Sequence, residues 1–205
     1  LLEESLRLLQ TDHLDLWQIH NLSRGEQVEQ IFAPDGAIKA LLEAREQGIV
    51  RFLGVTGHAD PHVLAEAIRR FPFDTVLMAL NAADKHHLSF IDHLLPLAVE
   101  KQMGIIGMKV PARGRILSSF TPSPGGASRW MRDSGPGTLS MREAFDYVVS
   151  LPVSTIIIGC DSVPQLEENI RLARSFNPLT EQQLAALAER TRPIHRQALF
   201  FRRWS

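Results

Sequence analysis

The chain has 205 residues, of which 44% are hydrophobic and 22% are charged, and its formal net charge is -1. This composition is typical of a globular protein with a single core, and it excludes a strongly basic surface for nucleic acid. No apolar run reaches the roughly 18 residues of a membrane span, and no signal-peptide pattern is visible. Cys160 is the only cysteine, which excludes an intrachain disulfide and is typical of a reducing, cytoplasmic compartment.

The first residues show a helical pattern. Leu2, Leu6 and Leu9 recur at the spacing of one helix face, and no capping residue precedes them. The sequence begins inside this pattern with Leu1 rather than with a methionine. We therefore expect the parent protein to have further residues before it.

Short apolar runs then alternate with amphipathic helices. Strands are predicted over the ranges 14–20, 51–56, 74–80, 104–109 and 154–158. A helix is predicted over 35–47, with Asp35 as its N-cap. Further helices are predicted after helix-start patterns at Asp60-Pro61, Ser89, Ser140-x-x-Glu143, Ser162-x-x-Gln165 and Thr180-x-x-Gln183. Residues 110–138 are rich in Pro, Gly and Ser, have no apolar period, and are predicted to be irregular.

The predicted strands are nearly continuous in Val, Ile, Leu and Met, which is typical of parallel strands covered on both faces. Their regular alternation with helices indicates an α/β fold. This pattern alone does not separate an open doubly wound sheet from a barrel. No Gly-x-Gly-x-x-Gly follows any strand, which weakens the case for a Rossmann domain. Only five strands are visible, whereas a (β/α)8 barrel has eight over about 250 residues.

Four stretches of the sequence resemble the aldo/keto reductase family. They are SLRLLQTDHLDLWQIHN at 5–21, GIVRFLGVTGH at 48–58, KQMGIIGMKV at 101–110 and IIIGCDSVPQLEENI at 156–170. Their order and spacing agree with the family, so the resemblance covers essentially the whole chain. It implies a (β/α)8 TIM barrel of which this chain, residues 1–205, is a single partial domain. The five C-terminal β-α units would be present, and the first three would be missing.

The resemblance also implies a reaction, the NAD(P)H-dependent reduction of a small carbonyl compound to an alcohol. In the family, the missing units supply the catalytic Asp, Tyr and Lys, and the Tyr donates the proton. Tyr147 is the only tyrosine here, and it lies on the helix predicted before the last strand, so we do not expect it to be the donor. We therefore expect the parent protein to be an oxidoreductase and this chain alone to be inactive.

Polar residues at the ends of the first three strands are the next candidates. His20 matches the family histidine that orients the substrate carbonyl, although a lone histidine at a strand end is more often structural. Thr56, Gly57 and His58 follow the second strand, where the family usually has Ser-Asn beside the nicotinamide carboxamide. Gly57 cannot replace that amide, and His58 either compensates or caps the next helix. Asn81 matches a family amide beside the nicotinamide.

The fourth strand and the segment after it carry basic residues. Lys109 follows directly after the strand. Its side chain is expected to contact a cofactor phosphate, to be exposed to solvent, or to form a Schiff base with a carbonyl compound. Arg113, Arg115, Arg129 and Arg132 lie in the long irregular segment. The resemblance implies that this segment folds over the cofactor pyrophosphate, for which arginine is well suited. The alternative is a long solvated loop.

The resemblance places the adenosine end of the cofactor at the last strand and the start of the following helix. The residues concerned are Gly159, Cys160, Asp161, Ser162, Gln165, Glu168 and Asn169. A helix N-terminus suits a phosphate group. Gln165 stands where the family often has an arginine for the 2′-phosphate, so NADP is expected and NAD remains open. Without the resemblance, Glu168 and Asn169 would be an ordinary exposed helix face.

A metal site is not expected. His58, Asp60 and His62 lie close together in sequence, but the helix start at Asp60-Pro61 puts the two histidines on opposite sides. The remaining alternatives are a non-catalytic cofactor-binding fragment or regulatory subunit, and a Schiff-base lyase acting through Lys109. Partners expected are a small-molecule carbonyl substrate and, through an incomplete barrel, a second copy, with neither nucleic acid nor membrane.

Overall fold

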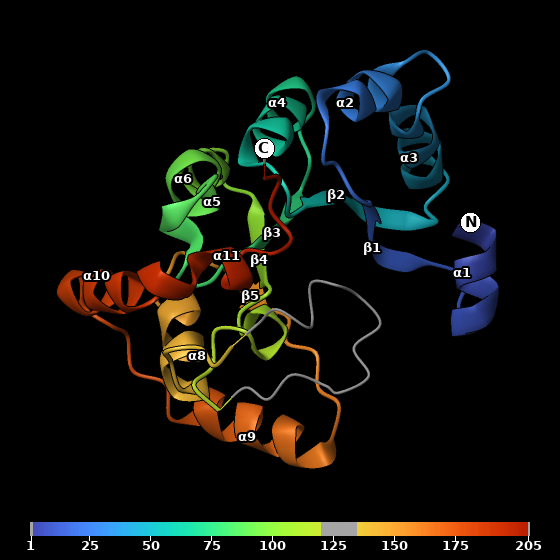
Figure 1. Cartoon of the computed structure of the whole chain (residues 1–205). Helices are drawn as coiled ribbons and strands as arrows, with labels where there is room; N and C mark the ends of the chain where they lie inside the picture. Colours follow the sequence, from blue (N-terminus) through green and yellow to red (C-terminus); the bar gives the residue numbers. More distant parts are fainter. Residues whose placement is uncertain (1, 120–134, 205) are drawn as a thin grey trace.

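The strands form one parallel sheet in the computed structural model, which describes residues 2–119 and 135–204 (Figure 1). They are β1 (Leu14–Ile19), β2 (Val50–Gly57), β3 (Thr75–Ala79), β4 (Gly104–Met108) and β5 (Thr155–Ile156). Their spatial order follows the chain, so each crossover joins neighbouring strands. Within the described residues β1 and β5 do not pair, and the sheet does not close into a barrel. The predicted parallel α/β fold is confirmed, and the sheet is consistent with part of a TIM barrel.

Helices follow one another around the outer side of the curved sheet (Figure 1). The α-helices are α1 (Leu2–Leu9), α2 (Gly25–Phe32), α3 (Ala37–Glu46), α4 (Pro61–Arg70), α5 (Phe90–His93), α6 (Leu95–Glu100), α8 (Met141–Val149), α9 (Val163–Arg174), α10 (Glu181–Arg190) and α11 (His195–Ala198). The described residues also form three single turns of 3-10 helix, η1 (Asp84–His86), η2 (Ala112–Gly114) and η3 (Arg192–Ile194). None of the described helices is long and apolar enough to cross a membrane.

The core lies between the sheet and these helices. Alternate residues of the strands point outward and are buried, among them Leu53, Val76 and Ile105. The residues between them face the concave side, which the described part of the chain leaves partly open. Phe52 and Ile157 on that side are 45% and 53% exposed. Burial of the outer face therefore drives the packing of the helices, and the concave face remains accessible.

Most local predictions are confirmed. The helices between β1 and β2 and between β3 and β4 differ from the prediction in three ways. The helix predicted at 35–47 is capped by Gly36 instead of Asp35, and α2 before it was not predicted. The sequence gives no sign of the start of α2, because its N-cap is Arg24 and not one of the usual capping residues. The helix predicted after Ser89 begins there but is divided at Leu94, because Pro96 lacks the N–H that a continuous helix needs.

The three predicted capping boxes have different outcomes. Those of α8 and α10 form as predicted, with Ser140 and Thr180 as the caps. The box at Ser162 is wrong, because the Ser162 side chain makes no cap hydrogen bond. The Gln165 side chain instead accepts a hydrogen bond from the backbone N–H of Asp161 at 2.7 Å. The same sequence pattern therefore gives a different local structure.

Candidate functional site

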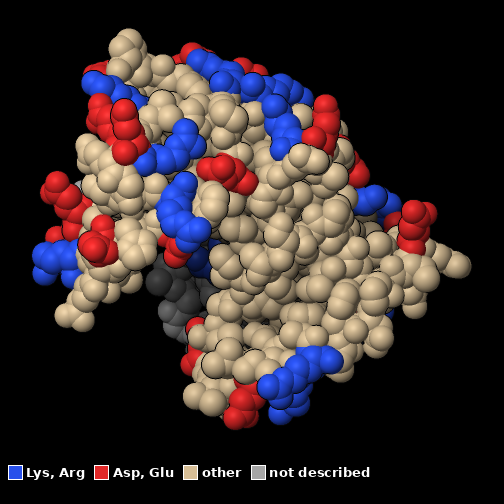
Figure 2. Space-filling view, turned by 180° about the vertical axis from the view of Figure 1, so that it is seen from behind, with Lys and Arg blue, Asp and Glu red and all other residues tan. Residues whose placement is uncertain are grey.

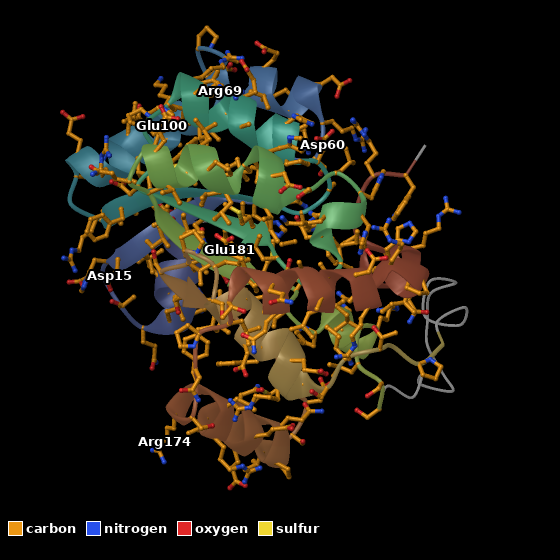
Figure 3. All side chains as sticks on the ribbon, turned by 90° about the vertical axis from the view of Figure 1, so that its left-hand side faces the viewer. Asp15, Asp60, Arg69, Glu100, Arg174 and Glu181 are labelled. Carbon is orange, nitrogen blue, oxygen red and sulfur yellow. The ribbon has the colours of Figure 1, made fainter. Side chains whose placement is uncertain are left out.

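The candidate site lies along the rim formed by the carboxyl ends of the strands. His20, His58, Asn81 and Lys109 each follow one of the first four strands, and parallel strands bring these ends to one edge. Figure 3 marks this rim with Asp60, which lies on the same side as the C-terminal segment. Asp15 and Glu100, near the amino ends of β1 and β4, lie on the opposite side.

His20 is exposed at the end of β1. Two residues later, the backbone N–H of Leu22 donates to the carbonyl of Thr56 at 3.0 Å, which holds the chain after β1 against the end of β2. Leu22 is buried, whereas the His20 ring remains accessible. The imidazole is therefore free of a packing role and can contact a bound molecule.

Thr56 and Gly57 are buried at the end of β2. A Cβ atom on Gly57 would lie 2.5 Å from the backbone oxygen of Leu22 and 3.2 Å from the Leu64 side chain. Any larger residue would have to displace this backbone, so an asparagine does not fit here without rearrangement. This close approach explains why the chain departs from the Ser-Asn pattern of the resemblance.

His58 is half-buried next to Gly57. Its Nδ1 lies 3.3 Å from the carbonyl oxygen of Phe201 in the C-terminal segment. Burial lowers the pKa of His58, and the positive charges of Lys109 and Arg202 lower it further. The neutral imidazole is therefore favoured at this rim. His62 lies beyond the α4 cap, where Asp60 accepts a hydrogen bond from its backbone N–H at 2.9 Å.

Asn81 is 1% exposed, and its side-chain amide is hydrogen-bonded to backbone groups. Its Oδ1 accepts a hydrogen bond from Ala83 N–H at 2.9 Å, and its Nδ2 donates to the carbonyl of Lys109 at 3.4 Å. Asn81 therefore ties the ends of β3 and β4 together. Its contact with a cofactor stays a prediction.

Lys109 adopts a left-handed backbone conformation with a φ of 63° and is half-buried. Burial lowers the pKa of Lys109, and the charge of Arg113 acts in the same direction. Arg113 is exposed, whereas Arg115 is buried with its guanidinium 4.1 Å from the centre of the Phe200 ring. The Arg113 guanidinium lies 5.8 Å from the centre of the same ring, so the two arginines share one aromatic neighbour and differ in exposure. Arg129 and Arg132 lie outside the described residues.

The start of α9 brings together most of the residues expected at the adenosine end. Those that are exposed are Gly159, Cys160, Asp161, Ser162, Gln165 and Glu168, and Asn169 is half-buried. The Nδ2 of Asn169 lies 3.1 Å from the Cys160 sulfur, which links the loop after β5 to the helix. This loop and helix present polar groups to solvent around a helix N-terminus, an arrangement that suits a phosphate. Among the described residues, no group of three or more His, Cys, Asp or Glu could hold a metal ion.

Sequence reasoning missed the C-terminal segment as part of this rim. The side chains of Arg202 and Asp84 form a fully buried ion pair, and Arg203 pairs with Asp60 at 2.6 Å. Burial raises the pKa of Asp84, while the charge of Arg202 opposes that shift. Burial lowers the pKa of Arg202 to about 10, which leaves it charged at neutral pH. In the sequence, Arg202 and Arg203 stand out only as two arginines among aromatic residues. No local pattern indicates that they pair with Asp84 and Asp60.

Tyr147 lies in α8 and is 1% exposed. Burial, followed by the negative charge of Asp84, raises the pKa of its hydroxyl well above its usual range. A buried hydroxyl that holds its proton so firmly does not suit a proton donor. The expectation that Tyr147 is not that donor therefore has a physical basis.

The fold and this rim define an α/β protein whose candidate site lies at the carboxyl ends of parallel strands. The model of the aldo/keto reductase family matches residues 1–191, and the chain belongs to that family. Among curated proteins, it is 24% identical over 208 residues to the uncharacterised oxidoreductase YqkF of Bacillus subtilis, with 93% of this chain covered. It is 25% identical over 190 residues to L-galactose dehydrogenase of Arabidopsis thaliana, with 87% of this chain covered.

Solved structures of the family have the same fold. The holo form of an aldo-keto reductase from Bacillus halodurans matches with a TM-score of 0.70 at 24% identity, covering 93% of this chain and 63% of that chain. A glycerol dehydrogenase from Gluconobacter oxydans also gives 0.70, at 19% identity, covering 94% and 63%. The chain spans 64% and 58% of the lengths of the two curated relatives.

Proposed function

We propose that the protein containing this chain is an NAD(P)H-dependent oxidoreductase that reduces a small carbonyl compound to an alcohol. One observation carries the proposal: His20, Thr56, His58, Asn81 and Lys109 converge on one rim from four neighbouring parallel strands. Ligands of such folds bind at the carboxyl ends of strands. Membership of the family and the names of the two curated relatives, an oxidoreductase and a dehydrogenase, support the same reaction class.

The residues of the rim have separate roles in this proposal. A bound nicotinamide would supply the hydride. His20, which is exposed and free of packing, orients the carbonyl oxygen of the substrate. The Thr56 hydroxyl and the neutral imidazole of His58 hold the carboxamide of the nicotinamide, with Asn81 fixing the neighbouring strand end. Because Tyr147 is buried, it is not the proton donor in this proposal, and we propose that this chain alone does not complete the reaction.

The residues at the start of α9 fit the adenosine end of either cofactor. The Gln165 side chain accepts a hydrogen bond from the Asp161 backbone N–H, and no basic residue lies between Gly159 and Gln165. A 2′-phosphate would therefore depend on Arg113 or on residues elsewhere. We propose NADP as the cofactor, with NAD accepted. The exposed free thiol of Cys160 suits a reducing compartment, and we propose the cytoplasm.

Reduction of aldehydes by the full-length protein, followed through the absorbance of NADPH and NADH, tests the proposal. Replacement of His20 by Asn should lower kcat/KM roughly a hundredfold, because positioning of the carbonyl is lost. His13→Asn is the matched control, since His13 is also exposed but lies before β1, at the opposite rim. Failure of both nucleotides to support any reduction would contradict the proposal.

A second candidate function rests on Lys109. Its amine is half-buried at the rim and has a lowered pKa, as an imine-forming lysine requires. In that reaction the Lys109 nitrogen bonds to a carbonyl carbon and the carbonyl oxygen leaves as water. Borohydride treatment with a carbonyl compound would then leave a covalent adduct on Lys109, detectable by peptide mass spectrometry. Under the reductase proposal no such adduct forms.

A further inference from the structure

The C-terminal segment sends one buried side chain beneath the candidate rim. Arg202 is 4% exposed, and its guanidinium reaches the ends of two neighbouring strands. Its Nη1 donates to the carbonyl of His58 after β2 at 2.8 Å. Its Nη2 donates to the carbonyl of Ala79 at the end of β3 at 3.3 Å, and also to the carboxylate of Asp84. The planar guanidinium therefore connects the backbone at the ends of β2 and β3 with the carboxylate of Asp84.

Asp84 is itself held in place by the loop after β3. Its Oδ2 accepts hydrogen bonds from the Ser89 hydroxyl at 2.8 Å and from the backbone N–H of Ile91 at 2.9 Å. Its own backbone N–H donates to the carbonyl of Asn81 at 3.1 Å. Both carboxylate oxygens are therefore used, and the carboxylate provides a rigid support for the guanidinium.

This arrangement fixes His58 from two sides. Arg202 binds its carbonyl oxygen, and the carbonyl of the adjacent Phe201 lies 3.3 Å from its Nδ1. The ring of Phe201 meets the imidazole edge-on, with centroids 5.9 Å apart. The segment around Asn81 is fixed in the same way, since Ala79 precedes it and Asp84 follows it. The contacts of Arg202 thus converge on the two residues expected to flank the nicotinamide.

We propose that Arg202, supported by Asp84, is a positioning residue that holds His58 and Asn81 in register for the nicotinamide end of the cofactor. This inference rests on the proposed function. The alternative is that Arg202 contributes only to general stability. A buried ion pair is a poor source of stability compared with apolar side chains of similar volume, whereas several directed donors specify geometry.

Binding of two nucleotides by the full-length protein separates the two roles. NADPH reaches both ends of the site, whereas phospho-ADP-ribose keeps the adenosine and pyrophosphate but lacks the nicotinamide, so it does not reach the nicotinamide end. Arg202→Met should raise the Kd for NADPH about tenfold and leave the Kd for phospho-ADP-ribose unchanged. A purely structural role would weaken both equally, and that result would overturn the proposal.

Arg192→Met is the matched control, because it removes an arginine of the same region whose ion pair with Glu189 is exposed. It should change neither Kd. Near-ultraviolet circular dichroism reports whether Arg202→Met folds. If it does not, Arg202→Lys replaces it, which keeps the charge but cannot donate to all three acceptors in one plane. It should show the same nicotinamide-specific loss, and equal losses for both nucleotides would again overturn the proposal.

A second readout does not depend on nucleotide binding. The imidazole of His58, followed by NMR, should titrate at higher pH in Arg202→Met, because a positive charge that lowers its pKa is removed. If the wild-type protein binds neither NADPH nor NADH, the proposed function fails, and this titration alone judges the role of Arg202. An unmoved His58 titration in the folded variant would overturn that role.

Discussion

The Cα atom of Gly57 lies directly against the backbone oxygen of Leu22, so close that a Cβ atom would stand only 2.5 Å from it. The hydrogen bond from Leu22 N–H to the Thr56 carbonyl fixes this approach. The ends of β1 and β2 are therefore joined through backbone alone. Neither partner can move aside as a flexible side chain would.

Replacement of Gly57 by Ala should therefore lower the free energy of unfolding by about 1–3 kcal/mol, the usual cost of overpacking. Gly25→Ala is the control, because nothing lies within 4 Å of a Cβ at Gly25. Urea denaturation of both variants measures the difference. Equal stability of the two variants would show that the rim tolerates a displacement of Leu22.

The lowered pKa of His58 predicts a dependence of stability on pH. The folded protein binds fewer protons here than the unfolded chain, between the lowered pKa and about 6.5. The contribution of the neutral His58 to the free energy of unfolding is therefore fully present above about pH 6.5 and is lost as the pH decreases through this window. Thermal unfolding from pH 8 to pH 5 should show this decline, and His58→Gln should reduce it. An unchanged pH profile in His58→Gln would contradict the burial of this imidazole.

The two serines that begin α8 and α9 form a matched pair. Ser140 accepts a hydrogen bond from the backbone N–H of Glu143 at 3.2 Å, whereas Ser162 caps nothing. Ser140→Ala should cost about 1 kcal/mol of unfolding free energy, and Ser162→Ala should cost almost nothing. Chemical denaturation distinguishes them. A comparable loss in both variants would restore the capping box at Ser162.

The accessible apolar side chains near β5 predict self-association, which remains a proposal. Ile157 lies beside the edge of β5 that has no partner strand within the described residues, and Val163, Leu166 and Ile170 form an exposed stripe along α9. Figure 2 shows a broad area of uncharged side chains on the rear face, with charged ones mainly around its margins. Because exposed apolar side chains beside an open strand edge associate to exclude water, this chain should sediment as dimers or larger species at high concentration.

Ile157→Lys should shift this equilibrium toward the monomer, since it introduces a charge at the open edge. Val99→Lys is the control, because Val99 is also exposed but lies on α6, away from β5. Sedimentation velocity over a range of concentrations measures the shift. A chain that stays monomeric throughout would contradict the prediction.

Local sequence patterns predicted the features that depend on neighbouring residues. The strands and most helix starts follow from apolar spacing and from caps such as Asp60 and Ser140, whose partners lie within three residues. The predicted strand at 154–158 shortens to β5, which within the described residues has a partner on one side only. The length of such an edge strand depends on its neighbours in the sheet, which the local sequence does not reveal.

The missed parts of the site depend on contacts between distant residues. Arg202 and Asp84 are 118 positions apart, and no periodicity links them. The need for glycine at position 57 becomes visible only when Leu22 is placed beside it. Burial of Arg115 against Phe200 is likewise a tertiary event. The family resemblance predicted the rim, but it did not predict what fixes the rim in this chain.

The position of Arg202 in the chain also has a consequence for biosynthesis. A ribosome makes all five strands before it reaches this residue, because synthesis proceeds from the N-terminus. Until then, the Asp84 carboxylate lacks the guanidinium of Arg202 and has donors such as the Ser89 hydroxyl and the Ile91 amide from its own loop. A nascent chain that ended before Arg202 would carry β1 to β5 and an unfinished rim. Competence for nucleotide binding would thus be acquired only after the strands of this chain have been made.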